Sequence, residues 1–290
     1  MIILAKRPDG RIVKNIEPLQ KITPYLMKKR YDSQNMIKTT YDCKPLDDYI
    51  AAKAKEGLEV NYMQILMAAM VRTIALRPQL NRFVMNGRIY TRFDITTSFV
   101  IHRSLREGST DDGGTDLKLH FKGTESIFDI IKVIDDAIDE NRHNEANGTD
   151  NLAKVLMSIP SFLIKGVVNL LMWMDRKSIL PKAIIDLSPF HTSFFVTNVK
   201  SIGLEYIFHH VYEFGTTGLF LALGKEKVVP VIDKATGEVT KSKQLEIGMV
   251  SDERFCDGLY FARSIKLFKK FMSNPALLET PLDAKVEDAE

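Results

Sequence analysis

Apolar residues recur at helical spacing in two segments of the chain. In SIFDIIKVIDDAIDENR (126–142), isoleucine returns every three or four residues, and Ser126 with Asp129 forms the pattern of an N-terminal cap. This spacing predicts an amphipathic helix with one buried face. The segment NYMQILMAAMVRTIALRP (61–78) is apolar on most sides and ends at Pro78, so it predicts a helix of the core.

Short strand-like runs alternate with these helices. TSFVIHR, TDLKLHF, TSFFVTN, LFLALG, KVVPVI and QLEIGMV are short apolar runs, several of them bounded by Gly, Asn or Asp, and GRIYTRFDI follows Asn86-Gly87. The segment IDKATGEVTK (232–241) predicts a hairpin with Thr236 and Gly237 at its turn. Interleaved helices and strands predict an α/β fold with a central mixed sheet flanked by helices.

The stretch SDERFCDGLY (251–260) joins the last strand-like run to a C-terminal helical run that ends at Asn274-Pro275. Two carboxylates, Glu253 and Asp257, therefore lie between a strand end and a helix start. Such a turn is exposed and rigidly held near a helix N-terminus, which suits a functional site. Acidic residues before a helix are also ordinary stabilising caps, and position alone favours that interpretation.

The segment VLMSIPSFLIKGVVNLLMWM (155–174) is apolar, but Pro160, Lys165 and Gly166 interrupt it. The first interpretation is a helix buried against the body or at a subunit contact. The second is a helix lying on a membrane surface, which Trp173 and the basic flank would suit. A membrane span comes third.

Composition narrows the class of protein, the number of domains and the cellular compartment. The chain has 290 residues, with 40 Lys plus Arg against 37 Asp plus Glu and a net charge of +3, too balanced for a nucleic-acid reader. We expect one domain over residues 1–282 and an acidic flexible tail over 283–290. Two cysteines, Cys43 and Cys256, and no signal-peptide pattern predict a cytoplasmic protein. No His, Cys and Asp cluster has metal-ligand spacing, so no metal is expected.

Six motifs in order along the chain carry a resemblance to a known family. They are ITPYLMKKRYDSQNMI, RPQLNRFV, SFFVTNV, LFLALG, DERFCDG and FKKFMSNPALL. Together they resemble the chloramphenicol acetyltransferase-like superfamily, and especially the catalytic domain of 2-oxo-acid dehydrogenase (dihydrolipoamide) acyltransferases. The resemblance covers nearly the whole chain. It implies a two-layer sandwich, a homotrimer with the active site between subunits, and a coenzyme A or lipoyl thioester as co-substrate.

The resemblance also implies roles for four residues. In the superfamily the catalytic turn reads His-x-x-x-Asp-Gly, in which the His accepts the proton of a thiol and the Asp holds an Arg. Asp257 and Gly258 match the end of this motif, Arg30 is the candidate partner of Asp257, and Thr197 matches the hydroxyl that stabilises the oxyanion. Glu253 occupies the position of the His.

That replacement changes the expected chemistry. Proton transfer from a thiol to an ordinary Glu is uphill by about 5.7 kcal/mol, against about 2.7 kcal/mol to His, a difference on the order of a hundredfold in rate. A desolvated Glu253 would close this gap, and His191, His209 and His210 are alternative bases. Three hypotheses follow: an acyltransferase, a non-catalytic thioester-binding or scaffold protein, and a membrane-surface module using residues 155–174.

Overall fold

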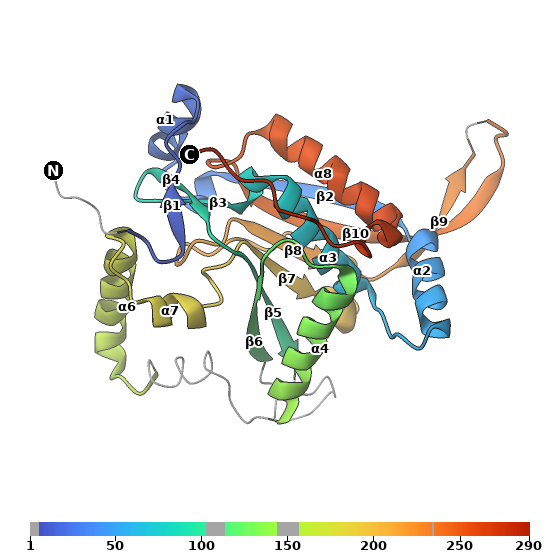
Figure 1. The fold of residues 1–290 in the computed structure, drawn as a ribbon, viewed down its shortest axis with the longest axis horizontal. Helices are drawn as coiled ribbons and strands as arrows, with labels where there is room; N and C mark the ends of the chain where they lie inside the picture. The colour runs from blue at the N-terminus through green and yellow to red at the C-terminus, as the bar shows by residue number, and fades with distance from the viewer. Residues whose placement is uncertain (1–5, 103–113, 144–156, 234) are drawn as a thin grey trace.

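The fold is built on a seven-stranded sheet (Figure 1) in a computed structural model that describes residues 6–102, 114–143, 157–233 and 235–290. Strand β7 runs parallel to both its neighbours and the other pairs are antiparallel, so the sheet is mixed, as predicted. The strand order is β2 (Gln34–Asp42), β10 (Val239–Asp252), β8 (Leu219–Leu223), β7 (Phe194–Asn198), β5 (Ile95–His102) and β6 (Gly114–Phe121), and β9 (Lys227–Ile232) pairs with β10. The predicted hairpin is the β9–β10 connection, with Gly237 at φ 74°.

A second, three-stranded sheet lies beside the first, in the order β1 (Gly10–Ile12), β4 (Arg88–Arg92) and β3 (Arg82–Met85). Strands β3 and β4 form a hairpin whose two turn residues, Asn86 and Gly87, have φ of 52° and 73°. Asn and Gly tolerate this left-handed region best, which explains why this pair ends one strand and begins the next.

Four helices cover one face of the main sheet (Figure 1). They are α2 (Lys44–Lys55), α3 (Tyr62–Leu76), α4 (Ile127–His143) and α8 (Gly258–Ser273). The predicted core helix is α3, which begins with a capping box between Asn61 and Gln64 and is buried along most of its length. The predicted amphipathic helix is α4, and its Ser126 and Asp129 cap each other's backbone N–H groups. One continuous apolar core joins these helices to the sheet and runs from Val13 to Leu278.

The other face of the sheet is crossed by an irregular segment, residues 204–215. A Cβ on Gly224 would lie 1.1 Å from the carbonyl oxygen of Glu205, and one on Gly248 would lie 2.0 Å from that of Ile207. The two glycines therefore allow the segment to lie directly on the sheet. Under it, Phe195, Phe220 and Val250 form a small separate apolar cluster. Short 3-10 helices occur at η1 (Arg30–Asp32), η2 (Pro78–Asn81), η3 (Val199–Ile202) and η4 (Pro275–Leu278).

Helices α1 (Pro18–Leu26), α6 (Ser161–Arg176) and α7 (Lys182–Leu187) lie at one end of the molecule, away from the four-helix layer (Figure 1). Helix α6 contains the apolar segment for which burial against the body or at a subunit contact was the first interpretation. Within one chain, Asp175 is the one buried residue of the helix and the others are half-buried or exposed, so α6 is not buried against the body. A subunit contact stays a prediction. Among the described residues, none of the helices is long and apolar enough to cross a membrane.

The acidic end of the chain, residues 283–290, differs from the expected flexible tail. The carboxylate of Asp288 accepts two hydrogen bonds of 2.7 Å from the buried guanidinium of Arg82, and the carbonyl of Glu290 accepts from the N–H groups of Lys14 and Asn15. A buried guanidinium needs a counter-charge, and Asp288 supplies it.

Candidate functional site

Thr197 lies near the end of β7, on the face of the sheet opposite α2, α3, α4 and α8. It is two residues beyond Phe195, whose ring belongs to the apolar cluster of that face, and alternate side chains of a strand share a face. Thr197 is half-buried and is among the residues that line a hollow of about 970 Å³ at this end of the sheet. Part of the wall is apolar, from Ile50, Val60 and Phe99 among others. The hollow is large enough for a small-molecule substrate.

Charged side chains on the same hollow form two ion pairs that the sequence did not indicate. The ammonium of Lys243 lies 3.0 Å from Asp47 and donates to the hydroxyl of Tyr62, which itself donates to Asp47. The ammonium of Lys200 lies 2.8 Å from Glu226. Burial and the carboxylate of Asp47 raise the pKa of Tyr62, so it stays a neutral donor. Each lysine is balanced by a carboxylate, so these four groups add no net charge to the hollow.

Glu253 follows the last residue of β10, as predicted, with its side chain exposed to solvent. Its backbone N–H donates to the carbonyl of Ser33, which fixes the turn. The neighbouring Arg254 does not face Glu253, because its guanidinium makes two hydrogen bonds of 2.8 and 2.6 Å to Asp252. Within one chain, Glu253 is therefore not desolvated.

Thr197 and Glu253 lie at opposite ends of the sheet. The strand register pairs Thr197 with Ala222 and Ala222 with Gly248, five residues before Glu253 along β10. Five residues of extended chain span about 17 Å, and two strand spacings add about 10 Å across the sheet. A single chain therefore cannot bring the two side chains together.

The expected ion pair between Asp257 and Arg30 is not formed. The exposed carboxylate of Asp257 instead accepts a 2.8 Å hydrogen bond from the N–H of Tyr260 and caps α8. The buried guanidinium of Arg30 donates to the carbonyls of Tyr212 and Gly215, both at 2.6 Å. The buried ion pair of this turn is formed by Asp252 and Arg254 instead. Asp257 is therefore free to cap the helix.

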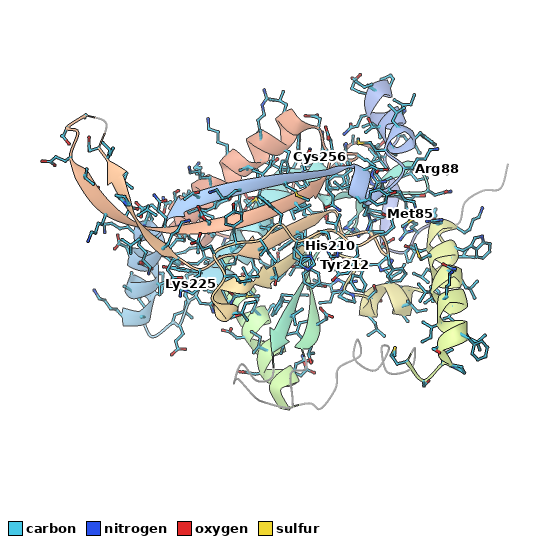
Figure 2. The ribbon with its side chains drawn as sticks, turned by 180° about the vertical axis from the view of Figure 1, so that it is seen from behind. Met85, Arg88, His210, Tyr212, Lys225 and Cys256 are labelled. Carbon is cyan, nitrogen blue, oxygen red and sulfur yellow. The ribbon has the colours of Figure 1, made fainter. Side chains whose placement is uncertain are left out.

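Two of the alternative histidines lie on the face that carries Thr197. The ring of His209 stacks on Phe220 with centroids 4.0 Å apart, and His210 follows on the segment that crosses the sheet, where Figure 2 labels it. Phe220 pairs with Phe195, and diagonal neighbours of a sheet have Cα atoms about 8 Å apart, so Phe220 and Thr197 are close. Nδ1 of His209 contacts the carbonyl of His210 at 2.8 Å, which leaves Nε2 able to accept a proton. Burial lowers the pKa of His209.

The third alternative, His191, belongs to a buried structural network. Its Nδ1 contacts the hydroxyl of Ser188 at 2.8 Å and its Nε2 contacts Asp175 at 3.2 Å, and Asp175 is also paired with Arg7. Although these are a serine, a histidine and an aspartate, all three are buried and none lines the hollow beside Thr197. Burial lowers the pKa of His191, so the ring is neutral.

Cys256 lies in the same turn as Glu253 and Asp257. Burial raises the pKa of Cys256 to about 12, so it is a thiol at neutral pH. Within the part of the chain that the structure describes, no group of His, Cys, Asp and Glu could hold a metal ion.

Solved structures share this fold at low sequence identity. The catalytic core of the 2-oxoacid dehydrogenase complex from Thermoplasma acidophilum matches with a TM-score of 0.56 at 14% identity, over 91% of this chain and 99% of that one. Dihydrolipoamide acetyltransferase of Azotobacter vinelandii, whose structure addresses a serine, a histidine and an asparagine in its catalytic mechanism, matches with a TM-score of 0.56 at 12% identity, over 90% and 88%. Chloramphenicol acetyltransferase matches with a TM-score of 0.55 at 10% identity, over 91% and 99%. No protein-family model and no curated protein matches the sequence.

Proposed function

Because this chain has the chloramphenicol acetyltransferase-like fold, shared with the catalytic cores of 2-oxo-acid dehydrogenase acyltransferases, we propose that it transfers an acyl group from a coenzyme A or lipoyl thioester to an acceptor. Fold alone does not confer activity, so the proposal depends on the site. The observation that carries it is the position of Thr197 among the residues that line a hollow of about 970 Å³. The apolar part of that wall suits an acyl chain.

In the proposed reaction a base takes the proton of the acceptor while the acceptor atom attacks the thioester carbonyl. The carbonyl oxygen becomes negatively charged and accepts a hydrogen bond from the hydroxyl of Thr197. The carbon–sulfur bond then breaks, and the thiol leaves with the proton that the base returns.

We propose that the site is completed by a second copy of the chain in a homotrimer. Thr197 and Glu253 are separated within one chain, and a heterologous ring of three would bring Glu253 of one subunit to Thr197 of the next. Enclosure at such a contact would desolvate Glu253 and raise its proton affinity, as a base requires. His209 is the alternative base, since it lies on the face of Thr197 without any partner subunit.

A non-catalytic, thioester-binding role is the second candidate function. The observation that favours it is the exposure of Glu253, at the position where the superfamily motif has a histidine. A protein of this kind would keep the hollow and the oligomer but turn over no donor.

Thiol release from a panel of acyl-coenzyme A donors tests these proposals. For the acyltransferase we expect Thr197→Val to lower the rate by about a hundredfold or more, as loss of an oxyanion donor does. Glu253→Gln should abolish turnover if Glu253 is the base, and Glu253→His should keep or raise it. Thr240→Val and Glu238→Gln, at exposed positions on the β9–β10 hairpin, are matched controls with no expected effect.

Three results would redirect the proposal. Full activity of Glu253→Gln together with loss in His209→Asn would assign the base to His209. Unchanged activity in Thr197→Val would reject the proposed oxyanion site. Coenzyme A binding without turnover of any donor would establish the non-catalytic role.

A further inference from the structure

Helix α6 buries one residue, Asp175, and half-buries a face that includes Ile164, Val167 and Leu171. The carboxylate of Asp175, near its C-terminal end, is 2% exposed, lies 2.8 Å from the guanidinium of Arg7 and contacts the ring of His191. The rest of the 16-residue helix is exposed or half-buried. Helices with so apolar a sequence normally bury one face, so the exposure of α6 requires an explanation.

The outward face of α6 is a stripe of four large apolar side chains. Phe162, Leu163, Leu170 and Trp173 are 80%, 47%, 54% and 51% exposed. At about 100° per residue, these positions fall within an arc of about 100° on the helix, opposite Asp175. The exposed side chains therefore form one continuous surface, which we call the α6 stripe.

All exposed charges on α6 and the turn after it are positive. Lys165 and Arg176 border the α6 stripe on one side, and Lys177 follows the helix; among the described residues none of the three has an ion-pair partner. The acidic residue of the helix, Asp175, is buried and neutralised by Arg7. The surface thus combines an apolar stripe with a cationic border.

Helix α1 lies beside α6 and also exposes apolar side chains. Pro24 and Tyr25 of α1 line the same hollow of about 410 Å³ as Met172 and Arg176 of α6. Leu19, Ile22 and Leu26 recur at helical spacing on α1 and are 75%, 48% and 71% exposed. Lys28 and Lys29, just beyond α1, line the hollow between the two helices.

We propose that α6, with α1 beside it, docks on the surface of a membrane that contains anionic phospholipids. Apolar side chains, one tryptophan and a cationic border are the features of helices that lie in the membrane interface. This surface is independent of the site around Thr197, so the inference does not rest on the proposed function. Helix α6 lies on the membrane and does not cross it, since it is about 24 Å long and interrupted by Lys165 and Gly166.

A second copy of the chain fits the α6 stripe less well. A stripe about 24 Å long and about 10 Å wide offers about 240 Å², far below the roughly 800 Å² that each partner of a stable interface buries. Pairing two copies through the same surface would also place their cationic borders against each other. An anionic lipid surface complements that border and imposes no minimum area.

The single tryptophan of the chain, Trp173, reports on this surface directly. We expect its emission to shift to shorter wavelength when vesicles of phosphatidylcholine with phosphatidylglycerol are added to the full chain, and lipids brominated on the acyl chain to quench it. Vesicles of phosphatidylcholine alone should bind more weakly, and added salt should weaken the binding to anionic vesicles.

Variants that keep Trp173 measure how much individual apolar and cationic side chains of this surface contribute to membrane binding. Phe162→Ser and Leu170→Ser should each weaken partitioning by about tenfold, because each removes one buried apolar side chain from the membrane contact. Lys165→Gln and Arg176→Gln should each weaken it by about fivefold at low salt. Ile232→Ser, at a position 65% exposed on the distant β9–β10 hairpin, is the matched control and should bind like the unmodified chain.

Two results would overturn the proposal. One is unchanged Trp173 emission and no co-sedimentation with anionic vesicles at millimolar lipid. The other is emission that is already at short wavelength without lipid and shifts to longer wavelength on dilution, which would show that a second copy of the chain covers the α6 stripe.

Discussion

At the scale of single residues, three carboxylates within six positions have three different surroundings. Asp252 is 2% exposed and bonded to Arg254 and Ser33, Glu253 is exposed, and Asp257 caps α8. The loss in free energy of unfolding on removing each carboxylate should depend on these surroundings. Asp252→Ala should lower the free energy of unfolding by about 3–5 kcal/mol, because it leaves the Arg254 charge buried and unpaired. Asp257→Ala should cost about 1 kcal/mol, the typical value of an N-cap.

Urea unfolding of the two variants and of Glu253→Ala as an exposed control measures these costs. Equal losses for Asp252→Ala and Asp257→Ala would contradict the assignment of the buried pair to Asp252.

Lys118 makes stability depend on pH. Its ammonium donates to the carbonyls of Ile185 and Ser188 at 2.6 and 3.2 Å, and burial lowers its pKa to about 7. An unfolded Lys keeps its proton up to a pKa of about 10.4, so between pH 7 and 10 the unfolded chain binds more protons than the folded one. Stability should therefore rise with pH through this window, by an amount on the order of a few kcal/mol.

The measurement is urea unfolding at pH 7, 8.5 and 10, compared between the unmodified chain and Lys118→Met. The variant should lose most of this rise. Parallel pH profiles would show that Lys118 titrates alike in the folded and unfolded chains.

At the scale of elements, the crossing of segment 204–215 over the sheet depends on two glycines. Gly224→Ala and Gly248→Ala place a Cβ within 1.1 and 2.0 Å of backbone carbonyl oxygens, which the segment can accommodate only by lifting away. We expect each to lower the free energy of unfolding by about 2 kcal/mol or more, the effect of overpacking at a close backbone contact. Gly258→Ala is the control, because nothing lies within 4 Å of its Cβ position.

The same variants test the position of His209. The segment holds His209 on Phe220. If His209 is the base, Gly248→Ala should therefore impair turnover even at urea concentrations at which the variant is still folded. Normal stability of both alanine variants would reject the close crossing.

At the scale of the whole molecule, the separation of Thr197 from Glu253 makes the proposed site a property of the oligomer. Light scattering should give three times the mass of the chain, and a stable monomer at micromolar concentration would exclude the shared site. Mixing the two impaired variants Thr197→Val and Glu253→Gln and then allowing subunit exchange should restore activity. In random trimers about a quarter of the sites would combine an intact Thr197 with an intact Glu253 from the neighbour.

The control for this experiment is the same mixture without subunit exchange, which should stay inactive. No recovery after exchange, with both variants inactive separately, would mean that the two residues do not act in one site between subunits.

The sequence by itself determined the features that depend on neighbours a few positions apart. The 3.6-residue periods of α3 and α4, the caps at Asn61 and Ser126 and the turns at Asn86-Gly87 and Gly237 all follow from local backbone and side-chain interactions. The interleaving of helical and strand-like runs led to the α/β class, and the order of the motifs led to the chloramphenicol acetyltransferase-like fold; the mixed sheet and the matching structures confirm both.

Only the tertiary structure decided which groups meet. A motif position could not show that Arg254 forms an ion pair with Asp252 while Asp257 caps α8. Which carboxylate pairs with the arginine depends on which carboxylate is buried. Nor could an apolar pattern show that one face of α6 is exposed, since burial depends on which surface packs against the helix. The stacking of His209 on Phe220 and the distance between Thr197 and Glu253 likewise result from the approach of segments far apart in the chain, which local preferences do not specify.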